Sequence, residues 1–524
     1  MSTTRAVWIF ILVLTAIRLA LISATELSFD EAYYWMWAQR PALSYFSKGP
    51  GVALAIRSSI ALFGDNEFGV RFWSPLLAAG TSLLLYYFAQ RLFSSLAGFW
   101  LVLALNVTPI FNLGSLVMTI DPLSVFFWVA ALVAFWRAIE LSPAFSWWWP
   151  FTGLLIGLGF LCKYTNALEL VSVLLVLGLT RRLRREFVRP NLYLLLIIFA
   201  LSTIPPIVWN SERAWITLAH LRARGSLNHT LGVHPLELLS FLGEHFVTYS
   251  PLLFFGLAWA TIASWRRARE NFKVLYLLWF GLPVFALYAI LSINKAAAPN
   301  WDCLAFLSLG VLAISYWRER SASRTTARNW TNAATILGLL MSAALIALML
   351  SPAGIPGRKN DPSDRVRGWR ALAEAVQTVR SDFEKRTGQR VFLIADERDR
   401  AAELAFYLPD KRVEGPGHPP VYIPESQDMV NQFSFWPRYD EFVPRPGNAP
   451  PDENEVYTEE SGVNFFTGRT ALFLQLGKKE RLPRSITGGF ERTEPIATIE
   501  VRVHGRLLRH LQVYACYDYR TMPL

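Results

Sequence analysis

The sequence predicts a mostly α-helical membrane protein with a second, smaller domain at its C-terminal end. Of its 524 residues, 53% are hydrophobic and only 17% are charged, whereas soluble domains usually have about a quarter charged residues. The 20 Trp and 36 Phe residues fit lipid-facing and interfacial surfaces. Long apolar runs recur as far as Leu350, and the residues after Pro352 are rich in charge, Pro and Gly. We therefore predict a transmembrane domain over residues 1–351 and a soluble α/β or α+β domain over residues 352–524.

About eleven apolar runs are near the length of a helix that crosses a bilayer. The two runs on either side of Lys163 are shorter, and interrupted spans often hold polar groups at membrane depth. The first run has features of a signal peptide, but its length and the many runs that follow favour a retained helix. The runs are Ala6–Ala24, Val70–Arg91, Leu96–Leu113, Pro122–Ile139, Trp148–Leu161, Leu168–Leu179, Leu192–Trp209, Phe241–Ala263, Val274–Ser292, Ala298–Tyr316 and Thr331–Leu350.

The positive charges predict the orientation of these spans. The net charge is +11, and dense basic runs such as Arg181–Arg185 and Arg266–Arg269 lie in loops that are cytoplasmic if the N-terminus is inside. A strongly basic chain can also bind nucleic acid, but basic runs between apolar segments are the usual topology signal. We therefore expect the N-terminus inside, no nucleic-acid partner and, with an odd number of spans, a C-terminal domain on the outer face.

The C-terminal domain alternates between helical and strand-like patterns. A helical period and short buried runs predict an amphipathic helix, a strand and a second helix, and strand-like alternation returns twice later. These segments are Gly368–Lys385, Arg390–Asp396, Ala401–Leu408, Thr470–Gln475 and Thr498–His504.

Ionisable residues gather in the loops that we expect on the outer side. Charge near membrane depth is costly, so it is normally paired or functional. Carboxylates in separate loops, together with several cations on one face, predict a site that handles an anion and a proton. The residues are Asp30, Glu31, Lys48, Asp121, Lys163, His220, Arg222, Arg224, His234 and Lys295.

The segment after the first run begins with a helix-start signal. Ser28 and Glu31 have the S-x-x-E spacing of a capping box, so Glu31 either fixes the helix start or contacts substrate. Asp30 lies in the same first turn, where it can stabilise the helix dipole or take part in chemistry. The aromatic residues that follow, Tyr34 and Trp37 among them, fit a helix at the membrane surface as well as stacking on a substrate.

Three residues in separate loops have both a structural and a functional interpretation. Lys48 precedes Gly49, which allows close backbone approach and suits a phosphate, although lysines also extend to the membrane interface. Asp121 before Pro122 fits a helix N-cap as well as a site residue. Lys163 fits a ligand contact as well as a buried ion pair, for which Asp121 is the candidate partner.

The segment Ala219–Gly225 contains His220, Arg222 and Arg224. Guanidinium groups bind phosphate with a planar pair of donors, and they also bind lipid headgroups. We favour a phosphate site here.

Two further groups of polar residues give weaker signals. The histidines at positions 220, 229, 234 and 245 lack the spacing of metal ligands. Asn300, Trp301 and Asp302 begin a predicted span, where we expect a cap and an aromatic belt, with a substrate role as the alternative.

Four segments make the chain similar to the polytopic glycosyltransferases with the GT-C fold. Among these it most resembles the lipid A aminoarabinose transferase and the bacterial relatives of the protein O-mannosyltransferases. The similarity covers most of residues 1–350, and the segments occur in the order of the family. They are residues 30–35 (DEAYYW), 45–48 with 62–71 (YFSK and LFGDNEFGVR), 121–128 (DPLSVFFW) and 157–163 (GLGFLCK).

The resemblance implies a donor sugar on a polyprenyl phosphate and a role for each matched residue. Asp30 would take the proton from the acceptor hydroxyl, and Asp121 would be a second catalytic residue. Lys48 and an arginine, Arg222 or Arg224, would hold the donor phosphate. Substrate contacts are expected from Glu31, Tyr34, Lys163 and His220. Ser47 stands where the aminoarabinose transferase has an acidic residue, so we predict no metal bridge there; a divalent metal elsewhere stays open.

The predicted function is therefore an inverting transfer of a sugar to an envelope acceptor at the outer face of a bacterial inner membrane. Lipid A, another glycolipid, a polysaccharide and a protein remain open as acceptors. The sequence contains no G-x-G-x-x-G motif of a nucleotide-binding fold and no P-loop. The alternatives are a multi-span transporter or lipid flippase, whose sites usually lie at the membrane midplane, and a non-catalytic assembly protein.

Overall fold

The computed structural model describes residues 2–142, 144–224, 232–351, 361–444, 462–477 and 481–521. These residues form two compact units. Unit 1 consists of Met1–Ala24 and Pro41–Leu348, and unit 2 consists of Thr25–Arg40 and Met349–Leu524. The short segment Thr25–Arg40, which follows the first apolar run, thus folds with the C-terminal residues.

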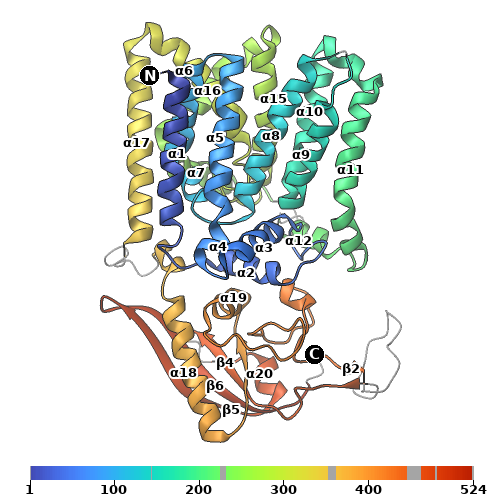
Figure 1. Cartoon of the computed structure of the whole chain (residues 1–524), viewed down its shortest axis with the longest axis vertical. Helices are drawn as coiled ribbons and strands as arrows, with labels where there is room; N and C mark the ends of the chain where they lie inside the picture. The colour runs from blue at the N-terminus through green and yellow to red at the C-terminus, as the bar shows by residue number, and fades with distance from the viewer. Residues whose placement is uncertain are drawn as a thin grey trace. The chain divides into compact units, whose positions relative to one another are not determined.

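Unit 1 is built from helices throughout its described residues (Figure 1). The longer helices are α1 (Thr3–Leu21), α3 (Gly51–Phe63), α5 (Trp73–Leu92), α6 (Ser95–Val107), α8 (Ile120–Glu140), α9 (Trp148–Cys162), α10 (Leu168–Leu179), α11 (Pro190–Ser211), α13 (Pro235–Tyr249), α14 (Pro251–Ser264), α15 (Phe272–Leu291), α16 (Ala305–Ser323) and α17 (Thr325–Leu350). The shorter helical segments are α4 (Glu67–Arg71), α7 (Pro109–Gly114), η1 (Tyr164–Ala167), η2 (Arg181–Val188), α12 (Ile216–Arg224) and η3 (Arg266–Arg269).

Several of these helices are long and apolar enough to cross a membrane. Among the described residues, 6 helices meet this condition by length and composition, and α13 with α14, which are bent by 116°, would bring the number to 7. The helices α3, α6, α9 and α10 are apolar but shorter. The prediction of a mostly helical membrane domain is therefore confirmed, while the number of about eleven spans and their orientation stay predictions.

Helix α8 lies at the centre of unit 1. In the most apolar stretch of α8, 83% of the residues are buried. In the corresponding stretches of α1 and α17, only 17% are buried. α8 packs against α5 and α9, and α9 packs in turn against α11. The crossing of α9 and α11 depends on Gly153, because a Cβ atom there would lie 2.2 Å from the carbonyl oxygen of Leu195.

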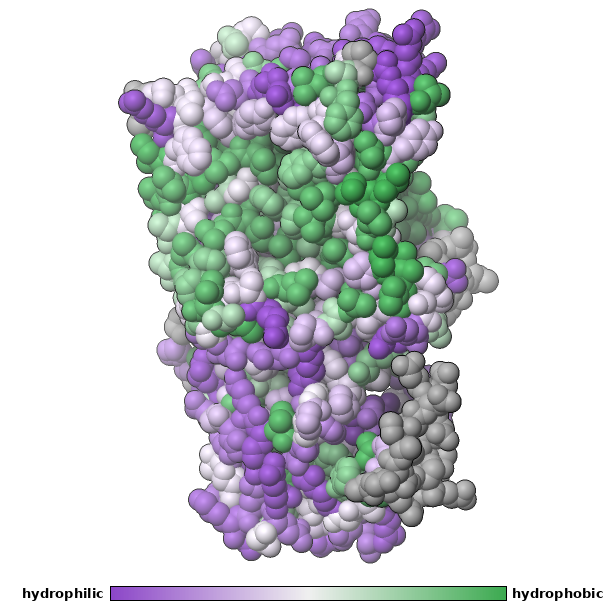
Figure 2. Space-filling view, turned by 45° about the vertical axis from the view of Figure 1, so that its right-hand side comes forward, coloured by the Kyte–Doolittle hydropathy of each residue, from purple (hydrophilic) through white to green (hydrophobic). Residues whose placement is uncertain are grey.

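The surface of unit 1 is strongly apolar. Figure 2 shows hydrophobic side chains over a broad band of its helices. Water-exposed patches of this size are rare in soluble proteins, so the band fits contact with lipid. Exposed members include Trp8, Leu12, Ile197, Leu201, Phe255, Ile262, Ile336 and Leu340.

Unit 2 is a small mixed domain around a four-stranded sheet with the order β1-β4-β6-β5. β1 (Phe392–Ala395) pairs in parallel with β4 (Ala471–Leu476), and β6 (Arg506–Tyr519) pairs antiparallel with both β4 and β5 (Phe490–Val503). A separate pair is formed by β2 (Val443–Pro444) and β3 (Gly462–Val463). The helical segments of this unit are α2 (Phe29–Gln39), η4 (Pro362–Val366), α18 (Trp369–Thr387), α19 (Arg398–Tyr407), η5 (Gln432–Phe435) and α20 (Arg484–Gly489).

The elements predicted for the C-terminal residues are present, together with several that were not predicted. Helix α18, strand β1, helix α19 and strand β4 each match a predicted segment to within a few residues. β5 is longer than the predicted strand Thr498–His504, and its hairpin partner β6 was not predicted. Polar and apolar residues do not alternate regularly along β6 (RLLRHLQVYACYDY), so the periodicity gives no clear strand signal there.

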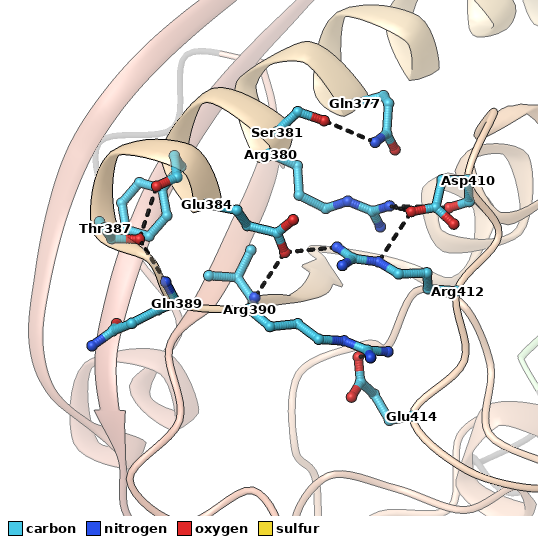
Figure 3. A network of polar contacts seen from close by, with 12 residues as sticks. Gln377, Arg380, Ser381, Glu384, Thr387, Gln389, Arg390, Asp410, Arg412 and Glu414 are labelled. Atoms are coloured by element: carbon cyan, nitrogen blue, oxygen red, sulfur yellow. Dashed lines mark hydrogen bonds and ion pairs between the residues drawn. The ribbon is translucent and has the colours of Figure 1, made fainter.

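Charged side chains join the C-terminal half of α18 to the segment after α19 (Figure 3). Arg380 bonds to Asp410 at 2.7 Å, and Glu384 accepts a bond of 2.7 Å from Arg412. Glu384 also accepts a hydrogen bond from the backbone N–H of Val391 at 2.9 Å. The network thereby fixes α18 against the start of β1.

Candidate active site

The centre of the candidate site in unit 1 is a buried group of three residues from three segments. Lys163 Nζ lies 2.8 Å from Asp121 Oδ1 and donates to the carbonyl oxygen of Asn300 at 2.9 Å. The side-chain amide of Asn300 in turn donates to Asp121 Oδ2 at 2.8 Å. Because the Lys163 side chain is 7% exposed and that of Asp121 is 19% exposed, the attraction acts in a medium of low dielectric constant. The predicted pairing of Lys163 with Asp121 is confirmed.

Local structure explains why these two side chains meet. Lys163 is the extended residue at which α9 ends, just before η1. Asp121 lies in the first turn of α8, and the helix is capped by Thr119, whose hydroxyl oxygen accepts from the backbone N–H of Asp121 at 3.2 Å. The interpretation of Asp121 as the N-cap is therefore wrong. Its carboxylate is left available for Lys163 and Asn300.

The third residue belongs to the segment 292–304, which joins α15 to α16. The expected role of Asn300 and Asp302 as the cap of a span is wrong, because α16 begins later, at Ala305. Asp302 is fully buried and accepts from His245 Nε2 at 3.0 Å at both carboxylate oxygens, while His245 Nδ1 lies 2.6 Å from the carbonyl oxygen of Phe241. Both ring nitrogens of His245 thus face hydrogen-bond acceptors on two different segments.

Helix α13 holds this segment at several further points. Tyr249 donates to the carbonyl oxygen of Pro299 at 3.2 Å, and Glu237 accepts from the backbone N–H of Ala296 at 2.8 Å. These contacts, with the His245–Asp302 pair, fix the backbone on which Asn300 lies. Sequence reasoning missed this role, because His245 was considered only as a metal ligand and its partner lies 57 residues further along the chain.

Lys48 lies in a closed loop against the end of α9. Its carbonyl oxygen accepts from the Ser44 hydroxyl at 3.2 Å and from the Tyr45 N–H at 3.0 Å. A Cβ atom at Gly49 would lie 2.3 Å from the carbonyl oxygen of Leu161. The close approach that Gly49 allows is therefore to the backbone of α9, two residues before Lys163. The glycine gives no direct sign of a phosphate, but it fixes the Lys48 loop beside the central group.

Helix α12 contains the predicted cationic residues. The ring of His220 lies 4.7 Å from that of Phe46, in the Lys48 loop. The guanidinium group of Arg224 lies 4.8 Å above the ring of Trp301, next to Asn300. Arg222 is exposed on the same short helix. α12 thus connects the Lys48 loop with the segment that contains Asn300.

Asp30, Glu31 and Tyr34 lie in α2, which belongs to unit 2. The capping box is confirmed, because Glu31 Oε2 accepts from both the N–H and the hydroxyl of Ser28, at 2.9 and 3.0 Å. Glu31 is fully buried and Tyr34 is nearly so. Asp30 is partly exposed, and its charge is one of the influences on Arg398 of α19.

The aromatic residues of α2 pack inside unit 2. Tyr33 stacks on Phe433, with centroids 6.1 Å apart and planes 8° apart, and Trp35 meets Phe406 edge-on at 5.0 Å. Burial raises the pKa of Tyr33 to about 12, so its hydroxyl is neutral at physiological pH. These ring contacts hold α2 against the rest of unit 2, a role that the sequence did not indicate.

The described residues contain no group of three or more His, Cys, Asp and Glu side chains that could hold a metal ion. His229, one of the histidines considered above, lies outside the described residues.

Comparisons with known proteins find relatives in sequence and in fold. The family model for dolichyl-phosphate-mannose-protein mannosyltransferase matches residues 47–209. The lipid A galacturonosyltransferase RgtD of Rhizobium johnstonii is 26% identical over 417 residues, which are 77% of this chain and 82% of the relative. The undecaprenyl phosphate-alpha-4-amino-4-deoxy-L-arabinose arabinosyl transferase of Edwardsiella ictaluri is 25% identical over 62% of this chain and 59% of its own length.

The fold is also that of a solved structure. ArnT from Cupriavidus metallidurans, bound to undecaprenyl phosphate, superposes with a TM-score of 0.62 at 14% identity, and 98% of each chain is covered. Its apo state gives a TM-score of 0.59 at 16% identity. The chain thus has the fold of ArnT, and its sequence is similar to those of polytopic membrane glycosyltransferases.

Proposed function

We propose that the chain transfers a sugar from a polyprenyl-phosphate donor to an acceptor of the bacterial envelope. The observation that supports this most strongly is that three segments with cationic side chains lie close together at the end of α9 in unit 1. The Lys48 loop lies against α9, Lys163 follows the end of that helix, and Arg224 of α12 covers Trp301. Cleavage of a sugar–phosphate bond leaves negative charge on the phosphate, and fixed cations stabilise that charge more in the transition state than in the ground state.

The donor phosphate would be held by Lys48 and by an arginine of α12. Arg224 is the better supported of the two arginines, because its stacking on Trp301 orients it next to the central group. Arg222 remains the alternative. Lys163 and His220 would contact the donor as well, although Lys163 already neutralises Asp121 at 2.8 Å.

Asp30 is proposed as the base. Its carboxylate would take the proton of the acceptor hydroxyl as that oxygen attacks the anomeric carbon. The bond from this carbon to the phosphate oxygen breaks in the same step, and polyprenyl phosphate leaves. Asp121 would act by holding Lys163 in place. Tyr34 stays a candidate for substrate contact, and the two bonds from Ser28 favour a structural role for Glu31.

The relatives favour particular substrates. Their names specify lipid A as an acceptor and an undecaprenyl phosphate sugar as a donor, and we propose the same classes here. A glycolipid of another kind, a polysaccharide or a protein remain alternatives for the acceptor. An apolar cavity of about 240 Å³ in unit 1, lined by Leu101, Leu253, Phe306 and Trp317, has room for part of a lipid chain.

The proposal includes the predicted topology. The N-terminus would lie in the cytoplasm, about eleven spans would cross the inner membrane, and unit 2 would face the periplasm. Donor and acceptor would then both be used at the outer leaflet.

The test is transfer of radiolabelled sugar from a polyprenyl-phosphate donor to lipid A by the purified protein in detergent. We expect Asp30→Asn to abolish transfer and Lys48→Ala to raise KM for the donor. Asp428→Asn, the same chemical change at an exposed position of unit 2, is the control and should be fully active. Full activity of both Asp30→Asn and Lys48→Ala would refute the assignment of the site.

Two further measurements separate the alternatives. Mass spectrometry of envelope glycolipids and glycoproteins from a deletion strain would identify the acceptor by the mass that it loses. Movement of a labelled lipid across sealed vesicles without any covalent transfer would support the transporter and contradict the enzyme.

A further inference from the structure

Unit 2 contains a polar cavity of about 500 Å³ that the reaction described above does not use. It opens where β1 ends and α19 begins, and its wall includes Arg398, Tyr422, Glu425, Phe433 and Arg438. β1 is paired in parallel with β4. Crevices at the carboxyl ends of parallel strands are frequent ligand sites, because the loops there diverge.

The charged groups around the cavity are almost all neutralised by one another. Arg438 forms a two-point ion pair with Asp440, and Arg398 pairs with Asp399 at 3.0 Å. Arg400 contacts both Asp396, at 3.4 Å, and Glu397, at 2.6 Å. No arginine of the described wall is thus left without a carboxylate partner, which disfavours a phosphate or another anion as the ligand.

Glu425 differs from these paired charged groups of the cavity wall. Its side chain is 7% exposed, and neither carboxylate oxygen has a hydrogen-bond partner among the described residues. Burial raises the pKa of Glu425 to about 7, and the nearby hydroxyls of Tyr519 and Tyr439 lower it only in part. A buried carboxyl without a partner is costly, so a ligand with hydroxyl or amino donors would stabilise it.

The rest of the wall is aromatic and apolar. The rings of Tyr422, Phe433 and Tyr439 lie between several prolines, Pro424 and Pro437 among them. Pockets for small polar ligands commonly combine such flat apolar faces with a few directed polar groups. The C–H faces of a sugar ring fit the aromatic surface, and its hydroxyls fit Glu425.

This cavity adjoins the helix that contains the proposed base. Phe433 stacks on Tyr33 of α2, and the backbone N–H of Gln432 donates to the Tyr33 hydroxyl at 2.7 Å. Arg398 lies 5.1 Å above the Tyr33 ring. Burial lowers the pKa of Arg398, but the charges around it, that of Asp30 included, raise it overall. Helix α2 therefore packs against Phe433 and Arg398, two residues of the cavity wall.

We propose that this cavity is a saccharide subsite that binds a neutral or amino sugar of the acceptor through Glu425 and the rings of Tyr422, Phe433 and Tyr439. The inference rests on the proposed function, in which Asp30 activates an acceptor hydroxyl. A sugar bound here would lie beside the helix of the base, while its lipid part stays outside the cavity.

The test uses full-length protein in detergent and ligand-observed NMR by saturation transfer, with N,N′-diacetylchitobiose and a glucosamine disaccharide as probes. We expect binding in the millimolar range and a five- to tenfold loss in Glu425→Gln, which keeps the shape but loses the charge-assisted bond. Phe433→Leu should weaken binding as well, through the lost ring face. Glu384→Gln, the same change in the network of Figure 3, is the control and should bind like the wild type.

Several outcomes would overturn the subsite. They are no binding of either disaccharide, binding that both variants leave unchanged, and binding of glucose 1-phosphate in preference to the neutral sugars. The assay is independent of catalysis. Transfer without disaccharide binding would refute the subsite and leave the proposed function standing, whereas binding that responds to Glu425→Gln in a chain without transferase activity would support the subsite and refute the function.

Discussion

The two units bury charged side chains in different ways. Unit 1 has exposed pairs such as Arg267 with Glu319, but it also buries charged pairs in its interior. Lys163 and Asp121 are nearly buried, and His245 and Asp302 are both fully buried. In unit 2 the charges form wider networks whose members are mostly partly exposed, such as the network of Glu384 and Arg412, which joins α18 to the segment after α19. Ion pairs at a surface contribute little, whereas breaking a buried pair leaves an uncompensated charge. A buried pair in unit 1 is therefore a stronger sign of function than any pair in the networks of unit 2.

The largest effect is expected from breaking the Lys163–Asp121 pair. Lys163→Met leaves a carboxylate in a nearly buried place, so we expect a loss of about 3–5 kcal/mol of stability and of all detectable transfer. Thermal unfolding monitored by fluorescence, together with the transfer assay, measures both. Arg267→Gln, which breaks an exposed pair with Glu319, should cost less than about 0.5 kcal/mol.

A double variant separates stability from chemistry in the same pair. In Lys163→Met with Asp121→Asn, no charge is left unpaired, and we expect most of the stability to return without activity. If the double variant were active, the pair would be only a structural contact. Equal stability of Lys163→Met and the wild type would show that the pair is not buried as described.

The second largest effect is expected from breaking the His245–Asp302 pair, which positions Asn300. Asp302→Asn keeps the shape but removes the charge that His245 faces at both oxygens, and we expect a loss of about 1.5–3 kcal/mol. Because Asn300 is two residues away, KM for the donor should rise while the binding of the acceptor stays the same. Steady-state kinetics with both substrates test this. A fall in kcat alone, with both KM values unchanged, would contradict a positioning role.

A smaller effect is expected at the Lys48 loop. A Cβ atom at Gly49 would lie 2.3 Å from the backbone oxygen of Leu161, so Gly49→Ala must shift the loop, at a cost of about 1–3 kcal/mol. Donor KM should rise, since Lys48 moves with the loop. Gly114→Ala is the matched control, because nothing lies within 4 Å of its Cβ position. Equal donor KM values for the two variants would separate Lys48 from the donor.

The sequence predicted the helical and mixed units because their signals are local. Apolar runs, the basic loops and the capping box at Ser28 depend on residues that are near one another in the chain. The Lys163–Asp121 pair could be predicted only as a candidate, since charge near membrane depth needs a partner. The role of Asn300 could not be predicted, because it depends on where α16 begins and on how the preceding segment turns back to α8.

The interior of unit 2 was harder to predict for a related reason. Nothing in the local pattern of α2 shows that its aromatic residues pack on Phe406 and Phe433, which follow several hundred residues later. The S-x-x-E motif predicted the start of the helix, but the partner of a helix face depends on the tertiary fold. The subsite at Glu425 likewise brings together segments with no shared motif.

The smallest effect distinguishes two glutamates of unit 2 by the sign of their pH dependence. Burial alone would raise the pKa of Glu384, but the bonds from Arg412 and from the Val391 N–H outweigh it and lower the pKa. Its stabilising contribution is then complete above the unfolded pKa and is lost as the pH falls through the folded pKa. Glu384→Gln should therefore be less stable than the wild type at pH 7.5, by no more than about 1 kcal/mol because the pair is partly exposed, and this difference should vanish near pH 3. Glu425, whose pKa is raised to about 7 by burial, must show the opposite sign. The unfolded chain releases this proton from about pH 4.5, whereas the folded protein keeps it until about pH 7, so stability falls as the pH rises over that interval. Glu425→Gln should thus equal the wild type at pH 4 and exceed it at pH 8. Thermal unfolding of the full chain at these pH values tests both, and parallel pH profiles for the two variants would contradict the different environments of the two carboxyl groups.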